Sequence, residues 1–291
     1  MNNHSNPLVS VIMNSFNGER YLSEAIESIY SQSYPNWEII FWDNASTDNT
    51  KVIAQSFGSK IKYFCSEKNM PLGYARNLAF KKANGEFIAF LDDDDLWMPL
   101  KLEEQIPLFN NKEIGLVYSD VIYFNQKGFE QKHSKKFELV SGKCFSRLLN
   151  EIEVFPITTA SVIFRAEVLK SNLINCSKDL VPIRDSDLFC RIAYDWSIGC
   201  VKKPLSKIRA HDEQLSISNR NWFHEEWERN LSVYEKLILD YSDSKEILDN
   251  PRIALKKEPA YNQLLLNTYH NSKIIQKIKV TDSELRLLFT Y

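Results

Sequence analysis

The chain has 291 residues, of which 44% are hydrophobic and 25% are charged, and this composition excludes a wholly disordered protein. Its 36 basic and 38 acidic residues give a net charge of −2, so charge provides no reason to expect nucleic acid as a partner. No apolar run approaches the roughly 20 residues that span a bilayer, and the polar start does not resemble a signal peptide. The five scattered cysteines predict reduced thiols, and a cytoplasmic protein is expected.

Short apolar runs alternate with amphipathic segments through the first hundred residues. Strands are predicted at residues 8–13, 37–42, 61–65 and 87–91. Helices are predicted at 19–32, after Ser46 or Thr47, and at 73–84. This alternation predicts an α/β fold, in which a mostly parallel sheet is covered by helices on both faces.

The pattern is less regular after residue 95. One helix is predicted at 99–109, and another opens at 183–187 and runs through residue 193. Strands are predicted at 116–124, 160–164 and around 207–209. Residues 126–136 are polar and basic and predict a solvated loop. Beyond about residue 219 the apolar residues recur at helical spacing, which predicts a C-terminal helical extension.

Polar side chains follow three of the first four predicted strands, at residues 14–17, 43–44 and 92–95. Ligands bind outside the carboxyl ends of the strands in sheets of this kind. The sequence therefore predicts a site at one edge of the sheet.

The four consecutive aspartates Asp92 to Asp95 are the strongest chemical signal. Adjacent carboxylates repel one another, and a divalent cation removes that conflict. Carboxylates suit Mg²⁺ or Mn²⁺, which bind through one or two carboxylates, waters and substrate phosphates. The alternative is a solvated acidic turn that precedes the helix after Pro99.

Other candidate residues each have a structural alternative. Asp43 accepts the ring N–H of a pyrimidine or closes an Asx turn, and the residues alone do not decide between these roles. Phe16 stacks on a base or packs under its loop. Arg76 contacts the aspartates or phosphates, or forms a surface ion pair.

The second half of the chain contributes Asp185, Asp187 and His211. The two aspartates are spaced i, i+2, so they do not share a helical face. One of them is a candidate general base, and the alternative for both is an acidic helix N-terminus. His211 is a candidate for contact with a metal or a phosphate, or a structural residue.

Four segments in this order resemble the inverting glycosyltransferases of family 2: Val9–Asn17, Asp43–Thr50, Gly73–Asn77 and Ala83–Pro99. The resemblance covers roughly residues 8–212, fades between 125 and 155, and is absent after about 220. It implies a GT-A fold, a Rossmann-like mixed and mostly parallel sheet, over residues 1–220. Within it, residues 1–98 would form the nucleotide-sugar half and 99–220 the acceptor half, followed by the helical extension 221–291.

The resemblance also implies roles for single residues. Asp43 would accept from the uracil N3–H, with Asn14 and Phe16 lining the base pocket and Arg76 contacting the nucleotide sugar. The Asp-x-Asp motif would hold the ribose through Asp92 or Asp93 and the metal through Asp94. Asp185 resembles the catalytic base, with Asp187 supporting it and His211 near the diphosphate. Many members have Glu-Asp where this chain has Arg184-Asp185.

The function implied is an enzyme, a hexosyltransferase that uses Mg²⁺ or Mn²⁺. It would move a sugar from a nucleotide-diphosphate sugar to a saccharide or lipid-linked saccharide in cell-surface polysaccharide biosynthesis. UDP is favoured, and dTDP stays open because thymine has the same N3–H. A nucleotidyltransferase is an alternative, although residues 14–18 hold one glycine and no lysine. A non-catalytic GT-A scaffold is the third possibility.

The acceptor and the tail are less defined by the sequence. Five basic residues are candidates to guide an anionic acceptor, or are simply solvated: Lys127, Lys132, His133, Lys135 and Lys136. The tail carries an apolar stripe from Trp222 to Tyr241 and a later group of Lys273, Lys277 and Lys279. Docking on the domain, homodimerisation, or reversible contact with the inner face of a membrane are its possible roles.

Overall fold

The computed structural model describes residues 6–150, 157–170 and 185–212. The chain divides into two compact units, residues 1–144 with 156–211, and residues 145–155 with 212–291. The second unit contributes only α5 (Phe145–Asn150) and Asp212 to the described residues. The predicted helices at 221–291 lie outside them, so the fold and site below belong to the first unit.

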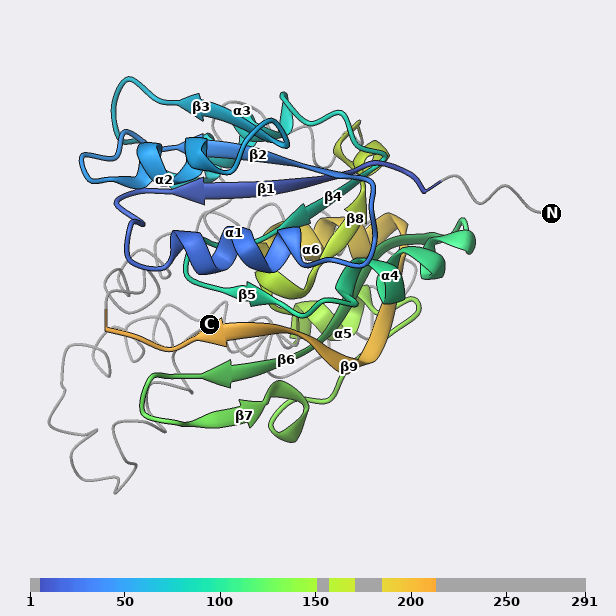
Figure 1. Ribbon diagram of the computed structural model, residues 1–291. Helices are drawn as coiled ribbons and strands as arrows, with labels where there is room; N and C mark the ends of the chain where they lie inside the picture. Colours follow the sequence, from blue (N-terminus) through green and yellow to red (C-terminus); the bar gives the residue numbers. More distant parts are fainter. Residues whose placement is uncertain (1–5, 151–156, 171–184, 213–291) are drawn as a thin grey trace, which may run out of the picture. The chain divides into compact units, whose positions relative to one another are not determined.

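The first four strands are parallel neighbours, as predicted (Figure 1). They are β1 (Val9–Ser15), β2 (Trp37–Asp43), β3 (Ile61–Cys65) and β4 (Phe87–Phe90). Gly85 permits β4 to enter beside β1, because a Cβ there would lie 2.6 Å from the Ser10 nitrogen and 2.7 Å from the Leu8 oxygen. All four carboxyl ends therefore meet one edge of the sheet.

The helices between these strands are shorter than predicted. They are α1 (Leu22–Tyr30), α2 (Thr50–Ser56) and α3 (Leu72–Phe80). Helix α1 starts three residues late because Gly18 and Glu19 donate their backbone N–H groups to Thr50 and Asp48 of another loop. Its buried positions Leu22, Ala25, Ile26 and Ile29 follow the i, i+3, i+4, i+7 spacing of an amphipathic helix.

The second half adds antiparallel pairs to the sheet. It contains β5 (Leu96–Trp97), α4 (Lys101–Gln105), η1 (Ile106–Asn110), β6 (Ile114–Phe124), η3 (Thr159–Ser161), β8 (Ile163–Arg165), η4 (Ala166–Lys170), α6 (Asp185–Asp195) and β9 (Ser197–Arg209). Within the described residues the strand order is β3-β2-β1-β4-β8-β6-β9-β5, with β7 on β6. The long ladders are parallel and the antiparallel ones span two or three residues, so the predicted mixed, mostly parallel sheet is confirmed.

Two strands predicted for this half have other bounds in the structure. The predicted strand at 160–164 is a 3-10 turn followed by β8. The predicted strand at 207–209 is the end of the 13-residue β9. The earlier part of β9 does not read as a strand in the sequence because it contains two lysines and Pro204, where the register against β6 shifts.

The predicted loop at 126–136 contains β7 (Glu130–Lys132) and η2 (His133–Lys135). His133 is buried under Tyr123, whose hydroxyl lies 2.9 Å from the imidazole Nδ1. This residue therefore does not belong to a solvated basic group, whereas Lys127, Lys132, Lys135 and Lys136 are exposed.

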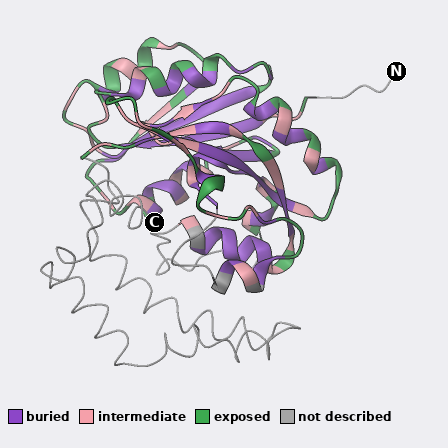
Figure 2. Ribbon diagram, turned by 90° about the horizontal axis from the view of Figure 1, so that it is seen from below, coloured by how far each residue is buried: buried purple, intermediate pink, exposed green. Residues whose placement is uncertain are grey.

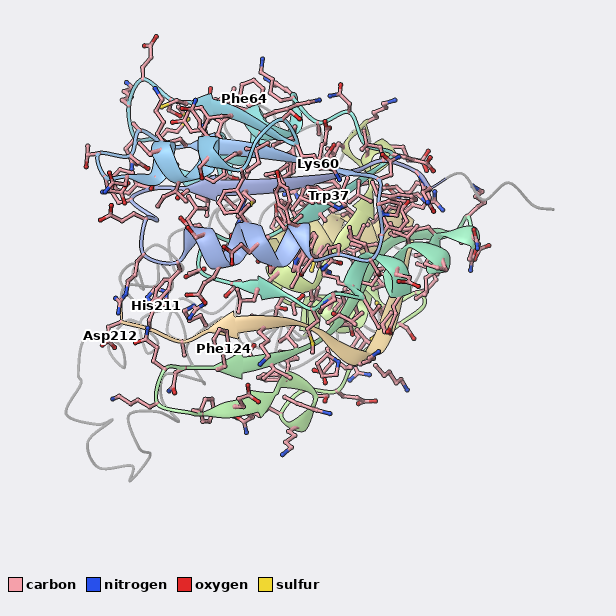
Figure 3. The ribbon with its side chains drawn as sticks, in the orientation of Figure 1. Trp37, Lys60, Phe64, Phe124, His211 and Asp212 are labelled. Atoms are coloured by element: carbon pink, nitrogen blue, oxygen red, sulfur yellow. The ribbon has the colours of Figure 1, made fainter. Side chains whose placement is uncertain are left out.

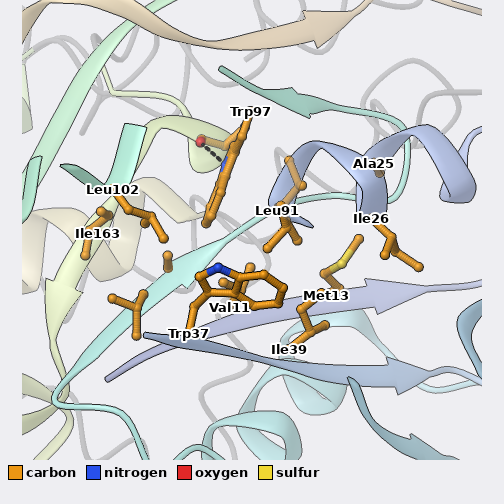
Figure 4. Close-up of a cluster of buried hydrophobic side chains, with 14 of the residues drawn as sticks. Val11, Met13, Ala25, Ile26, Trp37, Ile39, Leu91, Trp97, Leu102 and Ile163 are labelled. Atoms are coloured by element: carbon orange, nitrogen blue, oxygen red, sulfur yellow. Dashed lines mark hydrogen bonds between the residues drawn. The ribbon is translucent and has the colours of Figure 1, made fainter. Parts of the chain in front are cut away.

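The main core lies between β1, β2 and β4 and the helices α1 and α4 (Figure 4). Figure 2 shows the central strands of the sheet in the colour of buried residues, while several helices carry both buried and exposed positions. Val9, Val11 and Met13 of β1 point into this core. Side chains alternate along a strand, so Asn14 points to the opposite face and Ser15 to the face of α1. No helix of the described residues is long and apolar enough to cross a membrane.

Candidate active site

Two loops at the carboxyl edge of the sheet are bonded to each other. The first follows β1 and the second follows β2, and we call residues 17–19 and 46–50 the loop clasp. Asn17 N–H donates to Ser46 Oγ at 2.9 Å, and the Thr47 N–H donates back to Asn17 Oδ1 at 2.8 Å. Gly18 N–H donates to Thr50 Oγ1 at 2.9 Å. Because each loop satisfies backbone groups of the other, the clasp fixes the residues that flank it.

Asp43 lies at the end of β2 and is buried. Its Oδ1 accepts the Ser46 N–H at 2.7 Å, and this bond closes the Asx turn that is the structural alternative for Asp43. Its Oδ2 accepts the Tyr63 hydroxyl at 2.6 Å. Burial and the Asp43 carboxylate raise the pKa of Tyr63, so this phenol stays a donor. An ionised carboxylate has about four acceptor sites, so a further N–H can still be accepted. The contact with a base stays a prediction.

The two other residues predicted for the base pocket differ in exposure. Phe16 is 49% exposed, so the alternative of a residue packed under its loop was wrong. Asn14 is 91% buried, and its amide Nδ2 has no hydrogen-bond partner among the described residues. A buried donor without a partner is costly, and a bound ligand would supply the missing acceptor.

The four consecutive aspartates turn toward four different partners. Asp92 Oδ1 accepts from Arg76 Nη2 at 3.2 Å, and Asp93 accepts from the Ser15 hydroxyl. Asp94 Oδ2 lies 2.8 Å from His211 Nε2. Asp95 is buried and accepts the Arg209 N–H at 3.0 Å. The alternative of a solvated acidic turn was therefore wrong, since each carboxylate is tied to another element.

The charge of this acidic run is only partly compensated by these partners. Burial, followed by the neighbouring carboxylate of Asp94, raises the pKa of Asp93 to about 7. Burial also raises the pKa of Asp92 to about 6, against the opposing effect of Arg76. Such groups hold their protons to a higher pH than an ordinary aspartate does, and a nearby cation favours their ionised forms.

Two of the residues predicted to contact a metal ion, Asp94 and His211, lie side by side. His211 lies just beyond the end of β9 (Figure 3). Arg209, the last residue of β9, binds the acidic run by donating from its Nε to the Asp94 carbonyl at 2.9 Å. No group of three or more His, Cys, Asp or Glu side chains that could hold a metal occurs in the part of the chain described. Mg²⁺ and Mn²⁺ commonly use one or two protein ligands with waters and phosphates, so this pair fits such an ion when a diphosphate completes the site.

Asp185, the candidate base, begins α6 and is held by two other elements. One carboxylate oxygen accepts from Arg76 Nη1 and the other from the Thr159 hydroxyl. Arg76 is 6% exposed and also binds Asp92, so its alternative as a surface ion pair was wrong. Arg76 therefore joins the candidate base to the start of the acidic run.

Asp187 faces elsewhere, as its i, i+2 spacing from Asp185 predicts. It is buried and accepts from Arg191 Nε at 2.8 Å within the same helix. Its predicted support of the base remains untested, and the observed pair stabilises α6 itself.

Three residues of the site were missed by the sequence analysis: Ser15, Thr159 and Arg209. Ser15 lies within the predicted polar segment 14–17 but received no role of its own, although its position at the end of β1 was a usable signal. Thr159 and Arg209 carried none, because their partners Asp185 and Asp94 are 26 and 115 residues away in sequence.

Known proteins resemble this chain in sequence. The family model described as Glycosyl transferase family 2 matches residues 10–171. The uncharacterized glycosyltransferase RT0329 of Rickettsia typhi is 31% identical over 230 residues, 77% of this chain and 70% of that protein. The Escherichia coli UDP-Glc:alpha-D-GlcNAc-diphosphoundecaprenol beta-1,3-glucosyltransferase WfgD is 40% identical over 126 residues, 43% of this chain and half of that protein.

Solved structures share the fold. Residues 1–349 of S. aureus TarS in complex with UDP-GlcNAc align with a TM-score of 0.64 at 22% identity, covering 82% of this chain and 70% of that one. The mannosyltransferase PcManGT from Pyrobaculum calidifontis, in complex with GDP-Man and Mn²⁺, aligns with a TM-score of 0.62 at 16% identity, covering 98% and 79%. The sheet is thus of the GT-A type, and the chain belongs to glycosyl transferase family 2.

Proposed function

We propose that this glycosyltransferase moves a hexosyl group from a UDP-sugar to a saccharide or lipid-linked saccharide, with inversion at the anomeric carbon. The family and the named relatives support a role in cell-surface polysaccharide biosynthesis. The observation that carries the reaction type is the bridge formed by Arg76 between Asp185 and Asp92. It brings a carboxylate from the acceptor half to the acidic run of the nucleotide half.

The nucleotide would bind across the loop clasp. Asp43 would accept the uracil N3–H, Phe16 would stack on the ring, and the Asn14 amide would donate to the base or ribose. A stacked ring covers the exposed Phe16 and an acceptor satisfies the unpaired Asn14, so both features favour a planar polar ligand here. Thymine offers the same N3–H, so a dTDP-sugar is the second donor to test.

Asp94 and His211 would hold Mg²⁺ or Mn²⁺ against the diphosphate, and the cation would stabilise the charge of the leaving nucleotide. Asp92 or Asp93 would contact the ribose. The raised pKa values of these two carboxyls and their partners Arg76 and Ser15 support a site that takes a cation together with an anionic ligand. The complex of PcManGT with GDP-Man and Mn²⁺ concerns that protein, and it makes Mn²⁺ the first ion to try.

Asp185 would act as the general base. Each of its oxygens has one partner here and keeps an acceptor site for the acceptor hydroxyl. As that hydroxyl oxygen attacks the anomeric carbon, its proton passes to Asp185, and the bond to the diphosphate oxygen breaks on the opposite face. One displacement inverts the configuration and releases the nucleoside diphosphate. It requires no second carboxylate as nucleophile.

The acceptor of the transfer would carry an anionic group. The name of WfgD specifies a lipid-diphosphate saccharide as acceptor of that protein, and we infer an acceptor of this class for the present chain. Four exposed lysines near β7 would attract its anionic group. A homodimer and a peripheral contact with the inner face of a membrane are proposed for residues 221–291.

The test is incubation of the purified protein with UDP- and dTDP-sugars, Mn²⁺ and a set of saccharide and lipid-linked acceptors. We expect release of the nucleoside diphosphate and a product whose anomeric proton coupling reports the inverted linkage. In a parallel incubation with UTP or dTTP and a sugar 1-phosphate, release of pyrophosphate would instead identify a nucleotidyltransferase. A protein that binds the sugar nucleotide but transfers nothing to any acceptor would favour the non-catalytic scaffold.

A further inference from the structure

The orientation of the candidate base depends on a short turn that precedes β8. This turn, η3, carries Thr159, whose hydroxyl donates to the Asp185 carboxylate. The remaining oxygen of Asp185 is held by Arg76. Thr159 can orient the carboxylate only if the turn itself is fixed.

Side chains from other elements fix the turn through its backbone carbonyls. Trp97 Nε1 donates to the Ala160 carbonyl at 3.0 Å (Figure 4), and the Ser206 hydroxyl donates to the same oxygen at 2.8 Å. The Ser161 carbonyl accepts from Lys101 Nζ at 2.7 Å and from Gln105 Nε2 at 2.9 Å. Trp97, Lys101 and Gln105 all follow the acidic run within ten residues of Asp95, so they link that run to the turn.

Lys101 is the least expected member of this group. Its side chain is fully buried, and among the described residues no carboxylate lies within ion-pair distance of its ammonium. Its other contacts are the Gln105 side-chain oxygen and the Trp97 ring, whose centroid is 5.1 Å from Nζ. Burying a lysine without a counter-ion costs stability, and burial lowers its pKa well below the ordinary value. An apolar side chain would avoid this cost but could not bind the carbonyl of Ser161.

We propose that Lys101 is a positioning residue for the transfer reaction: it holds η3, together with Trp97 and Gln105, so that the Thr159 hydroxyl orients Asp185. This inference rests on the proposed function, in which Asp185 is the base. Lys101 touches neither substrate in this scheme and acts through the turn and Thr159.

The test compares Lys101→Met, Thr159→Val and the double variant with the wild type in the transfer assay. We expect Thr159→Val to lower kcat about tenfold or more, the effect of removing one hydrogen bond to a charged group. Thr159→Ser should restore most of the activity. Lys101→Met should lower kcat to a similar degree with an unchanged Kd for the nucleotide. Because Lys101 acts through Thr159, the double variant should be no slower than Thr159→Val.

Several results would overturn the inference. The first is a folded Lys101→Met variant with the kcat of the wild type. The second is a double variant in which the two losses of kcat multiply. The third is a loss of kcat in Lys101→Met that is no larger than the loss of folded protein. If Lys101→Met does not fold, Trp97→Phe removes another donor to the turn while leaving a smaller aromatic ring in place. This variant must then show a lower kcat with an unchanged Kd for the nucleotide. Lys207→Met, at a surface ion pair with Glu130, is the control for loss of a lysine.

Asp185→Asn separates this inference from the proposed function. If Asp185→Asn retains transfer, the assigned base is wrong and the proposed mechanism fails with it. If Asp185→Asn is inactive while folded Lys101→Met is as fast as the wild type, only the role of Lys101 is refuted.

Discussion

The nucleotide side and the base side of the site are built differently. On the nucleotide side, the contacts of the loop clasp join residues 29 to 32 positions apart, and most of them involve backbone N–H groups. On the base side, Arg76 and Asp185 are 109 positions apart, and the contact between Asp94 of the acidic run and His211 of the second half spans 117 positions. These contacts join side chains of separate elements.

This difference predicts different responses to mutation. Backbone hydrogen bonds in the clasp are numerous, so losing one side-chain acceptor leaves the others in place. A charged side chain such as Asp185 has no substitute, because its chemical role depends on its own ionised oxygens.

Asp185→Asn should produce the largest effect. It preserves the shape of the side chain but removes its ability to take a proton, so kcat should fall by roughly 10²–10⁴-fold. The Kd for the nucleotide, measured by titration calorimetry, should stay unchanged. Asp195→Asn, at the other end of α6 and exposed, is the matched control. Retained transfer in Asp185→Asn would move the role of base to Asp187 or to another residue.

Asp94→Ala should separate metal binding from the rest of the nucleotide side. Removing a proposed ligand should weaken Mn²⁺-dependent binding of UDP by about tenfold or more, as losses around metal sites commonly do. A chelator should have the same effect on the wild type and little further effect on the variant. Glu104→Ala removes a surface carboxylate paired with Lys203 and should behave as the wild type. If neither the chelator nor Asp94→Ala changes the Kd for UDP, the assigned metal site is refuted.

The acidic run should also make metal binding depend on pH. Without metal, the pKa of Asp93 is about 7 and that of Asp92 about 6 in the folded protein, against an ordinary value near 4. A carboxyl with a raised pKa favours the folded state at low pH, and this contribution is lost as pH rises through about 6 to 7. A cation binds the ionised forms, so protons compete with it at low pH.

We therefore expect Mn²⁺ with UDP to raise Tm more at pH 7.5 than at pH 5.5, with an apparent metal affinity about tenfold or more weaker at the lower pH. Thermal unfolding with and without the ion at each pH measures this. Asp93→Asn, which cannot titrate, should reduce the difference. An equal shift of Tm at both pH values would show that protonation of these carboxyls does not compete with binding of the cation.

Thr50→Val should have the smallest effect and tests the clasp. It removes the acceptor of the Gly18 N–H without changing the side-chain shape, at a cost of about 1 kcal/mol in the free energy of unfolding. The Kd for the nucleotide should rise only a few-fold. Thr47→Val is the control, because the clasp uses mainly the backbone N–H of that residue. A loss of binding as large as that of Asp94→Ala would mean that the clasp is not redundant.

Local patterns determined the first half of the fold and most candidate residues. The four parallel strands were predicted with ends that differ by at most two residues, because buried strands and amphipathic helices have distinct periods. The polar residues at the strand ends followed from the same pattern, since parallel strands deliver their carboxyl ends to one edge. The motifs around Asp43 and Asp92–Asp95 were therefore visible in the sequence.

The tertiary structure decided which of these residues meet. Only it shows that Arg76 is buried between Asp92 and Asp185, that His211 reaches Asp94, and that Lys101 and Thr159 lie on one path to the base. It also showed that His133 is buried and that β9 begins at Ser197. Periodicity reports the face on which a residue lies within its own element. It carries no information about the partner that packing brings to that face from a hundred residues away.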